Sequence, residues 1–161
     1  MTDPRYVPFR GHRTAVWVHG DLDAGVTPLV CLHGGPGLPH DYLQPLERLG
    51  DRGRPVVMYD QLGCGASDRP DDDTLWVIDT FVDELATVVA ALGIENRFHL
   101  LGHSWGGWLA QQYVLDRRPQ GLASLVLAST CSSLPAFAAV TRQLKETLPT
   151  DVQAKIGRAH V

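Results

Sequence analysis

A serine flanked by glycines, in the segment GHSWGG at residues 102–107, is the clearest candidate for chemistry in this chain. The apolar residues 98–101 precede it, and a helix-like segment follows it. A G-x-S-x-G pattern between a strand and a helix is typical of the sharp turn that lifts a serine hydroxyl clear of a parallel sheet. We therefore predict that Ser104 is a nucleophile. The alternative is a serine that only caps the helix after a glycine turn.

A serine nucleophile also requires hydrogen-bond donors for the oxyanion that forms during the reaction. The backbone N–H of Trp105 is one candidate, because the N-terminus of a helix favours negative charge. A second segment, HGGPG at residues 33–37, contains adjacent glycines that can turn backbone N–H groups toward a ligand. We predict Gly35 as the second donor, with Gly34 as the alternative. The segment could also be a plain tight turn that has no role in catalysis. His33 is expected to bond the loop backbone rather than to act as a base.

The segment YDQLGCGASDRP at residues 59–70 is rich in glycine and short polar residues, so we predict a structural loop. Cys64 within it could lie at the rim of a pocket, although nothing indicates a lowered thiol pKa. His40 and His99 are expected to be surface or satisfied histidines. His103 is adjacent to the nucleophile, but neighbouring residues at such a turn point in different directions, so we do not expect it to be the base.

A serine nucleophile of this type also requires a carboxylate and a histidine from later in the chain. We expect both the catalytic acid and the catalytic base to be absent from these 161 residues, so that the chain as given is an inactive fragment. The residues at 156–161 back-translate to the start of a common sequencing adapter, and we predict a non-native tail there. A natural terminus is the alternative. His160 is not counted as a catalytic candidate.

Apolar runs alternate with helical patterns along the chain, which predicts an α/β fold with a mostly parallel sheet and helices on both faces. Thr74 is a plausible N-cap for one long helix, and Gly93 would end that helix. The predicted strands cover residues 6–9, 14–19, 28–33, 54–59, 97–101 and 122–128, and the predicted helices cover residues 41–49, 74–92, 105–116 and 134–148. The sheet would therefore stop after about the sixth strand.

Composition excludes several classes of function. The net charge of −4 provides no basic field for nucleic acid or for anionic membranes. No apolar run approaches the roughly 18 residues of a membrane span, and the first residues lack the pattern of a secretory signal. The three cysteines are widely spaced and show no metal-ligand spacing, so we expect reduced thiols in the cytoplasm and no metal site.

Three segments together resemble the proline iminopeptidase family of α/β-hydrolases: HGGPG-x-x-HDYL at 33–43, YDQLGCG-x-SD at 59–68 and LGHSWGG at 101–107. The resemblance extends over about residues 5–150, which would be the N-terminal half of a member. It implies an enzyme that removes an N-terminal residue, typically proline, from small peptides or amides through an acyl-enzyme. Ser104 matches the family's nucleophile, and Trp105 with the HGGPG glycines matches its oxyanion hole.

The resemblance also implies a domain division. Residues 1–133 would form the N-terminal part of the hydrolase core, and residues 134–155 the start of a helical cap. The non-native tail predicted from the back-translation, residues 156–161, would follow them. The family's catalytic aspartate and histidine have no counterpart here. No cofactor is implied, because acyl transfer by this route needs none.

Two other readings remain open at this point. The protein could be an esterase or amidase of the same fold that recognises no free amine, or a non-catalytic half-domain that acts as a binding module. The serine at position 104, where an aspartate would stand, counts against epoxide hydrolases and dehalogenases. We also expect Leu122, Leu125, Val126 and Leu127 to lie on an open sheet edge, which predicts poor solubility or dimerisation.

Overall fold

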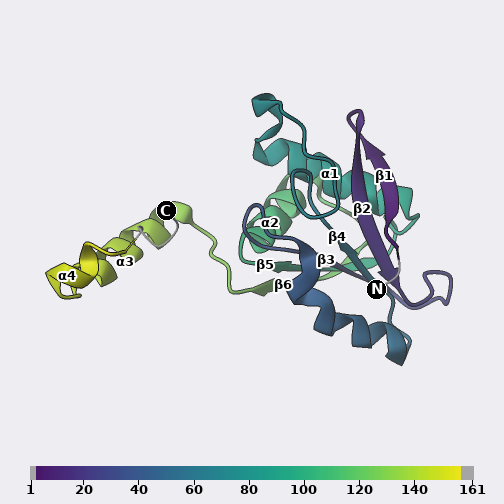
Figure 1. Cartoon of the computed structure of the whole chain (residues 1–161). Helices are drawn as coiled ribbons and strands as arrows, with labels where there is room; N and C mark the ends of the chain where they lie inside the picture. Colours follow the sequence, from purple (N-terminus) through teal and green to yellow (C-terminus); the bar gives the residue numbers. More distant parts are fainter. Residues whose placement is uncertain (1–2, 157–161) are drawn as a thin grey trace. The chain divides into compact units, whose positions relative to one another are not determined.

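The computed structural model describes residues 3–156, and the chain divides into two compact units, residues 1–130 and 131–161. Figure 1 shows the first unit as a sheet with helices packed against it. Its strands are β1 (Arg5–Phe9), β2 (His12–His19), β3 (Leu29–Leu32), β4 (Val56–Tyr59), β5 (Phe98–His103) and β6 (Leu122–Ala128). Its helices are the 3₁₀ helices η1 (His40–Arg52) and η2 (Asp73–Leu75) and the α-helices α1 (Ile78–Ala91) and α2 (Trp105–Arg117).

The strands form one sheet in the order β1-β2-β4-β3-β5-β6. The pairs β1/β2 and β2/β4 are antiparallel, whereas β4/β3, β3/β5 and β5/β6 are parallel. Every residue of β3 and β4 is buried, which explains why these strands appear in the sequence as continuous apolar runs. The predicted α/β fold with a mostly parallel sheet is confirmed.

The core lies on both faces of this sheet, because successive side chains of a strand point to opposite sides. Val30 and Leu32 of β3 belong to the cluster that contains the buried faces of α1 and α2. Leu29 and Cys31 belong to a second cluster, which includes Leu43 of η1. Helices therefore cover both faces, as predicted.

Two predicted helices differ from the structure. The prediction of one helix from Thr74 to Leu92 is wrong, because the side chain of Asp72 accepts hydrogen bonds from the Thr74 N–H (3.0 Å) and hydroxyl (2.7 Å) and caps the short helix η2 instead. The chain then becomes extended at Val77, and α1 begins at Ile78. The helix predicted at 41–49 is a longer 3₁₀ helix with Pro45 inside it, and proline has no N–H for the α-helical bond.

The second unit contains α3 (Leu134–Glu146) and α4 (Thr150–Gln153). Ser133 caps α3 by accepting a hydrogen bond from the Ala136 N–H at 3.3 Å. The assignment of residues 134–155 to a helical cap stays a prediction. Most of the predicted tail, residues 157–161, lies outside the described residues.

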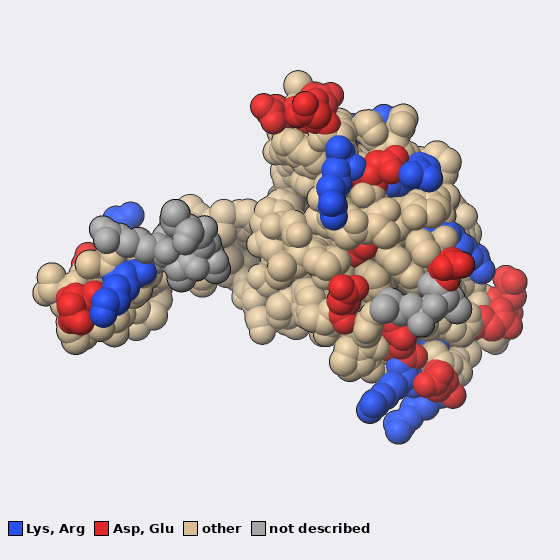
Figure 2. Space-filling view, in the orientation of Figure 1, with Lys and Arg blue, Asp and Glu red and all other residues tan. Residues whose placement is uncertain are grey.

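Among residues 3–156, no helix combines the length and the apolar character needed to cross a membrane. The cytoplasmic location stays a prediction. On the face of the first unit shown in Figure 2, acidic and basic side chains are interspersed rather than gathered into one basic surface.

Within the described part of the chain, β6 pairs only with β5 and forms one edge of the sheet. Val126 and Leu127 are each 44% exposed, which agrees with the prediction of an open apolar edge. Leu122 and Leu125 differ from that prediction, because both lie half-buried against the core that contains α1 and α2. The unpaired N–H and C=O groups of such an edge favour pairing with another chain.

We expect the purified chain to self-associate through β6. Replacing both Val126 and Leu127 with lysine should raise the dissociation constant of the dimer by more than about tenfold, because like charges then oppose each other across the paired edges. Sedimentation velocity at several concentrations measures this. Leu115→Lys is the matched control, since Leu115 is an exposed leucine that belongs to α2 and not to the β6 strand. Equal self-association of the edge variant and the unmodified chain would contradict the prediction.

Glu84 of α1 is a fully buried carboxyl group that ties β2 to the loop after β4. Its Oε1 accepts hydrogen bonds from the Thr14 hydroxyl at 2.6 Å and from the Leu62 N–H at 2.9 Å. Burial raises the pKa of Glu84 to about 7, although these two hydrogen bonds oppose the shift. The carboxyl group of Glu84 therefore keeps its proton to a higher pH in the folded chain than in the unfolded chain.

This shift predicts a pH-dependent stability. A pKa raised on folding contributes stability that is full below the unfolded value near 4.5 and is lost as the pH rises through about 7. Glu84→Gln should remove this dependence and make the variant more stable than the unmodified chain above about pH 7, by up to on the order of 3 kcal/mol. Urea unfolding between about pH 5 and about pH 8 measures it. The exposed Glu95→Gln is the control, and parallel pH profiles for Glu84→Gln and the unmodified chain would refute the assignment.

Candidate active site

Ser104 lies between the end of β5 and the first residue of α2, in the sharp turn that the sequence predicts. Its backbone has φ 55° and ψ −119°, a conformation that residues other than glycine rarely adopt. The Ser104 N–H donates to the carbonyl of Ala128 at 2.9 Å, and the Ser104 carbonyl accepts from the N–H of Gly107 at 3.0 Å. Hydrogen bonds on both sides of the residue therefore hold the strained turn in place.

Glycines around this turn allow α2 to approach β3 and β5 closely. A Cβ atom placed on Gly106 would lie 2.6 Å from the carbonyl oxygen of His33, and one placed on Gly102 would lie 2.5 Å from the Cα of Gly107. Real Cβ atoms do not approach backbone atoms so closely. The small residues on either side of Ser104 are therefore required by packing, as the sequence pattern indicates.

The glycine-rich loop after β3 lies directly beside Ser104. A Cβ atom on Gly34 would lie 3.0 Å from the Ser104 Cβ, so the two backbones are almost in contact. The Gly34 N–H donates to the Tyr42 hydroxyl at 2.6 Å and is therefore already engaged. Among residues 3–156, the N–H groups of Gly35 and Trp105 have no protein acceptor. This difference favours Gly35 over Gly34 as the second oxyanion donor, whose role remains a prediction.

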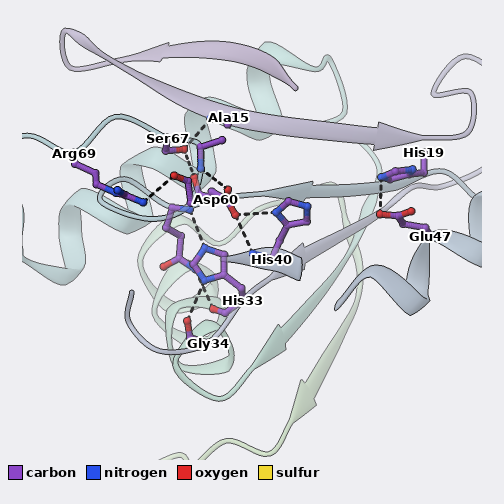
Figure 3. A network of polar contacts seen from close by, with 12 residues as sticks. Ala15, His19, His33, Gly34, His40, Glu47, Asp60, Ser67 and Arg69 are labelled. Carbon is purple, nitrogen blue, oxygen red and sulfur yellow. Dashed lines mark hydrogen bonds and ion pairs between the residues drawn. The ribbon is translucent and has the colours of Figure 1, made fainter. Parts of the chain in front are cut away.

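His33 is buried and both of its ring nitrogens are engaged (Figure 3). Its Nδ1–H donates to the Gly34 carbonyl at 3.0 Å, and its Nε2 accepts from the Gln61 N–H at 2.9 Å. Burial lowers the pKa of His33, although its bond to Gly34 opposes the shift, so the neutral ring is favoured. His33 thus bonds the loop backbone as expected, and neither nitrogen is available to a nucleophile.

His103 is also held in place by a hydrogen bond. The Tyr42 hydroxyl donates to His103 Nδ1 at 2.9 Å, which agrees with the expectation that His103 is not the base. His99 lies on the same strand, where its Nδ1 contacts the Ser124 hydroxyl at 2.7 Å. His99 is therefore a satisfied histidine.

His40 is buried and forms a pair with Asp60 (Figure 3). The Asp60 Oδ1 accepts from the His40 ring at 2.8 Å and from the His40 N–H at 2.9 Å, while Oδ2 accepts from the Ala66 N–H at 2.8 Å. Burial acts to raise the pKa of Asp60, but these hydrogen bonds outweigh it and hold the pKa below its usual value. The pair anchors the loop after β4, which agrees with the structural role predicted for that loop.

Gln61 is a site residue that the sequence does not single out. Its side-chain Nε2 donates to the His33 carbonyl at 3.0 Å, and its Oε1 accepts from the indole Nε1–H of Trp105 at 2.9 Å. A glutamine in a loop rich in glycine and aspartate carries no distinguishing signal by itself. Only the structure shows that this side chain joins the loop after β3 to the serine turn.

A cavity of about 400 Å³ lies beside these loops, within the range of small-molecule sites. Its walls include Pro36 and Gly37 of the glycine-rich loop and the aromatic rings of Trp76, Phe81 and Trp105. Cys64 also lines it, at the position that the sequence suggests, but burial raises the pKa of this thiol to about 11. Cys64 is therefore not a reactive thiolate. No cluster of three or more metal-ligating side chains exists among residues 3–156.

Comparisons with known proteins place this geometry in a family. A profile of the alpha/beta hydrolase fold matches residues 27–158. The chain is 46% identical to the proline iminopeptidase of Levilactobacillus brevis over 97% of this chain and 52% of that protein. It is 47% identical to that of Lactiplantibacillus plantarum over 92% of this chain and 52% of that protein. The resemblance to proline iminopeptidases that the motifs indicate is therefore confirmed.

Solved structures agree with this result. The crystal structure of VinJ is 41% identical with a TM-score of 0.87, and it matches over 95% of this chain and 52% of that one. The proline iminopeptidase of Mycobacterium smegmatis is 39% identical with a TM-score of 0.81, over 96% of this chain and 53% of that one. The chain thus spans about half the length of the relatives that it matches.

Proposed function

Because the chain belongs to the alpha/beta hydrolase fold family and is similar within it to proline iminopeptidases, we propose that it carries the nucleophile and the oxyanion site of a serine aminopeptidase. The substrate would be a small peptide or amide with an N-terminal proline or another small residue. The single observation that supports this most is the strained Ser104 turn, placed against a glycine-rich loop with an unengaged N–H.

In the proposed reaction, the Ser104 hydroxyl oxygen attacks the scissile carbonyl carbon while a base removes the hydroxyl proton. The carbonyl oxygen becomes an oxyanion that accepts hydrogen bonds from the N–H groups of Gly35 and Trp105. Collapse breaks the C–N bond, and the base returns its proton to the leaving amine. Water then cleaves the acyl-enzyme by the same route and regenerates the serine.

We place the catalytic aspartate and histidine in polypeptide outside these 161 residues. His33 precedes the glycines of the loop beside Ser104, and His103 is the last residue of β5; hydrogen bonds hold both rings in other roles. The relatives have about as much sequence again as this chain covers, which is room for both residues. No cofactor enters the proposal.

A second candidate is an esterase or amidase of the same fold. The described walls of the cavity beside Trp105 carry no carboxylate that could pair with a free amine, and Arg69 is their charged residue. The aminopeptidase reading therefore requires an acidic group from elsewhere, whereas the esterase reading does not.

The experiment that tests the proposal begins with the genomic DNA downstream of the Lys155 codon. We expect the reading frame to continue into strands that carry an aspartate and then a histidine. The complete protein should cleave a prolyl anilide and reject its N-acetylated form, because only the former presents a free amine. Equal cleavage of both would favour the esterase or amidase. A natural stop directly after the Val161 codon would overturn the aminopeptidase proposal.

A further inference from the structure

We propose that Gln61, acting through His33, is a positioning residue that fixes the Gly35 N–H relative to the Trp105 N–H. This inference rests on the proposed function, because it concerns the same oxyanion site. Gln61 is only 1% exposed, and the two ends of its amide connect the loop after β3 with the first residue of α2. The residue itself belongs to the loop after β4, so three separate segments of the chain meet at one side chain.

The first link acts on the peptide group between His33 and Gly34. Its carbonyl accepts from Gln61 Nε2 at 3.0 Å, and its N–H donates to the Tyr42 hydroxyl at 2.6 Å. Both polar ends of this planar unit are therefore held, one by a residue after β4 and the other by a residue of η1.

The second link acts on the next peptide group, which carries the oxyanion donor. The Gly34 carbonyl accepts from His33 Nδ1–H at 3.0 Å. In a trans peptide the N–H points away from the carbonyl of the same unit, so holding this carbonyl sets the direction of the Gly35 N–H. Glycine at position 35 has φ +120°, and without such a bond its backbone would have wide freedom.

Gln61 also sets the state of the His33 ring. Its backbone N–H donates to His33 Nε2 at 2.9 Å, which requires an unprotonated Nε2 and leaves the proton on Nδ1. That proton is the one donated to Gly34. The backbone of Gln61 therefore selects the tautomer that holds the donor peptide, while its side chain holds the neighbouring peptide.

The third link reaches the other donor. Gln61 Oε1 accepts from the Trp105 indole Nε1–H at 2.9 Å, and the backbone N–H of the same tryptophan is the first oxyanion donor. The indole also packs edge-on against Phe81, with ring centroids 5.8 Å apart. One glutamine amide thus spans from the residue that carries one donor to the loop that carries the other.

The first test uses the 161-residue chain and does not depend on catalysis. Two-dimensional NMR of the labelled chain resolves the indole N–H signals, and Trp105→Phe assigns that of Trp105. Gln61→Leu should shift the Trp105 indole signal and the Gly35 amide signal together. Gln61→Glu retains an acceptor for the indole but loses the Nε2 donor, so it should shift the Gly35 signal more than the indole signal. Gln112→Leu is the control, because the Gln112 side chain of α2 donates to Asp116. This variant should shift neither the Trp105 indole signal nor the Gly35 amide signal.

The second test uses the complete enzyme and separates positioning from a merely structural role. Gln61→Leu should lower kcat by about 10- to 100-fold with little change in KM, because displacing an oxyanion donor weakens binding of the transition state more than binding of the substrate. Gln61→Glu should lie between the leucine variant and the unmodified enzyme. In a double-mutant cycle, Gln61→Leu and Trp105→Phe should be non-additive, since each breaks the same hydrogen bond.

The inference is overturned if the folded Gln61→Leu enzyme keeps its kcat, if KM alone changes, or if the Gly35 signal does not move. Thermal unfolding of each variant identifies any that fail to fold. If Gln61→Leu does not fold, the same measurements are made on Gln61→Glu. An unmodified enzyme that cleaves simple esters but no prolyl amide would refute the proposed substrate only. The positioning of the oxyanion donors would still be measured on the ester.

Discussion

Replacing Ser104 with alanine is expected to reduce kcat of the complete enzyme by about 10⁶-fold, because loss of a triad serine removes the covalent route and leaves only residual oxyanion stabilisation. The backbone conformation at this position is unaffected by loss of the hydroxyl, so the unfolding free energy should change by less than about 0.5 kcal/mol. Prolyl anilide hydrolysis and urea unfolding measure the two quantities. Activity within about tenfold of the unmodified enzyme would exclude Ser104 as the nucleophile.

Ser104→Gly provides the matched control, since it removes the same hydroxyl and also relieves the backbone. A non-glycine residue in a sparsely populated conformation stores about 1–3 kcal/mol, and glycine loses some of this gain through its greater freedom when unfolded. We expect the glycine variant to be as inactive as the alanine variant and more stable by about 1 kcal/mol. A glycine variant less stable than the alanine variant would show that φ 55° at this site is not strained.

Gly106→Ala is expected to have the largest effect on stability. In the first turn of α2, alanine should be favoured over glycine by about 1 kcal/mol on helix propensity. The new Cβ, however, would lie 2.6 Å from the His33 carbonyl oxygen and closer still to that of Leu32. These are backbone atoms of β3 and the loop after it, which cannot rotate away, so we expect a loss of at least about 3 kcal/mol.

Gly107→Ala is the comparison for this prediction, because it adds the same methyl group one position along the same helix. Its new Cβ would meet the side chain of Thr130 at 2.6 Å rather than backbone atoms. A side chain can give way in part, so the loss should be smaller, about 1–2 kcal/mol. Urea unfolding of both variants shows which of them loses more unfolding free energy. If Gly106→Ala were the milder change, close backbone approach would not be the reason for glycine at this position.

Much of the fold could be predicted because its information is local. The buried strands β3 and β4 are continuous apolar runs in the sequence. The turn at Ser104 is marked by glycines that its close backbone packing requires. The start of α1 could not be predicted in the same way. Asp72 and Thr74 are both good capping residues, and the choice between them depends on a hydrogen bond that closes a separate short helix.

The supporting residues of the site were harder to predict for a different reason. The contacts of Gln61 join residues 28 and 44 positions away along the chain, and no local pattern encodes such a distance. His33 bonds the loop backbone as expected, whereas His40 is paired with Asp60 through Nδ1 only and its buried Nε2 has no partner among the described residues. The partners of both rings could not be identified without the sheet order. Residue types therefore suffice to single out Ser104 as the candidate nucleophile, whereas topology determines which residues support its turn.

The parallel pairing of β3 with β5 has a consequence for how this site tolerates change. The last residue of β3, Leu32, is aligned with Gly102 of β5, and each strand leads within a few residues to one of the two proposed oxyanion donors. A slip of one residue between these strands would displace one donor from the other by about 3.3 Å, more than a hydrogen bond can stretch. Stabilisation of a negative charge between the two proposed donors therefore depends on the alignment of β3 with β5, and insertions within these two strands should abolish it.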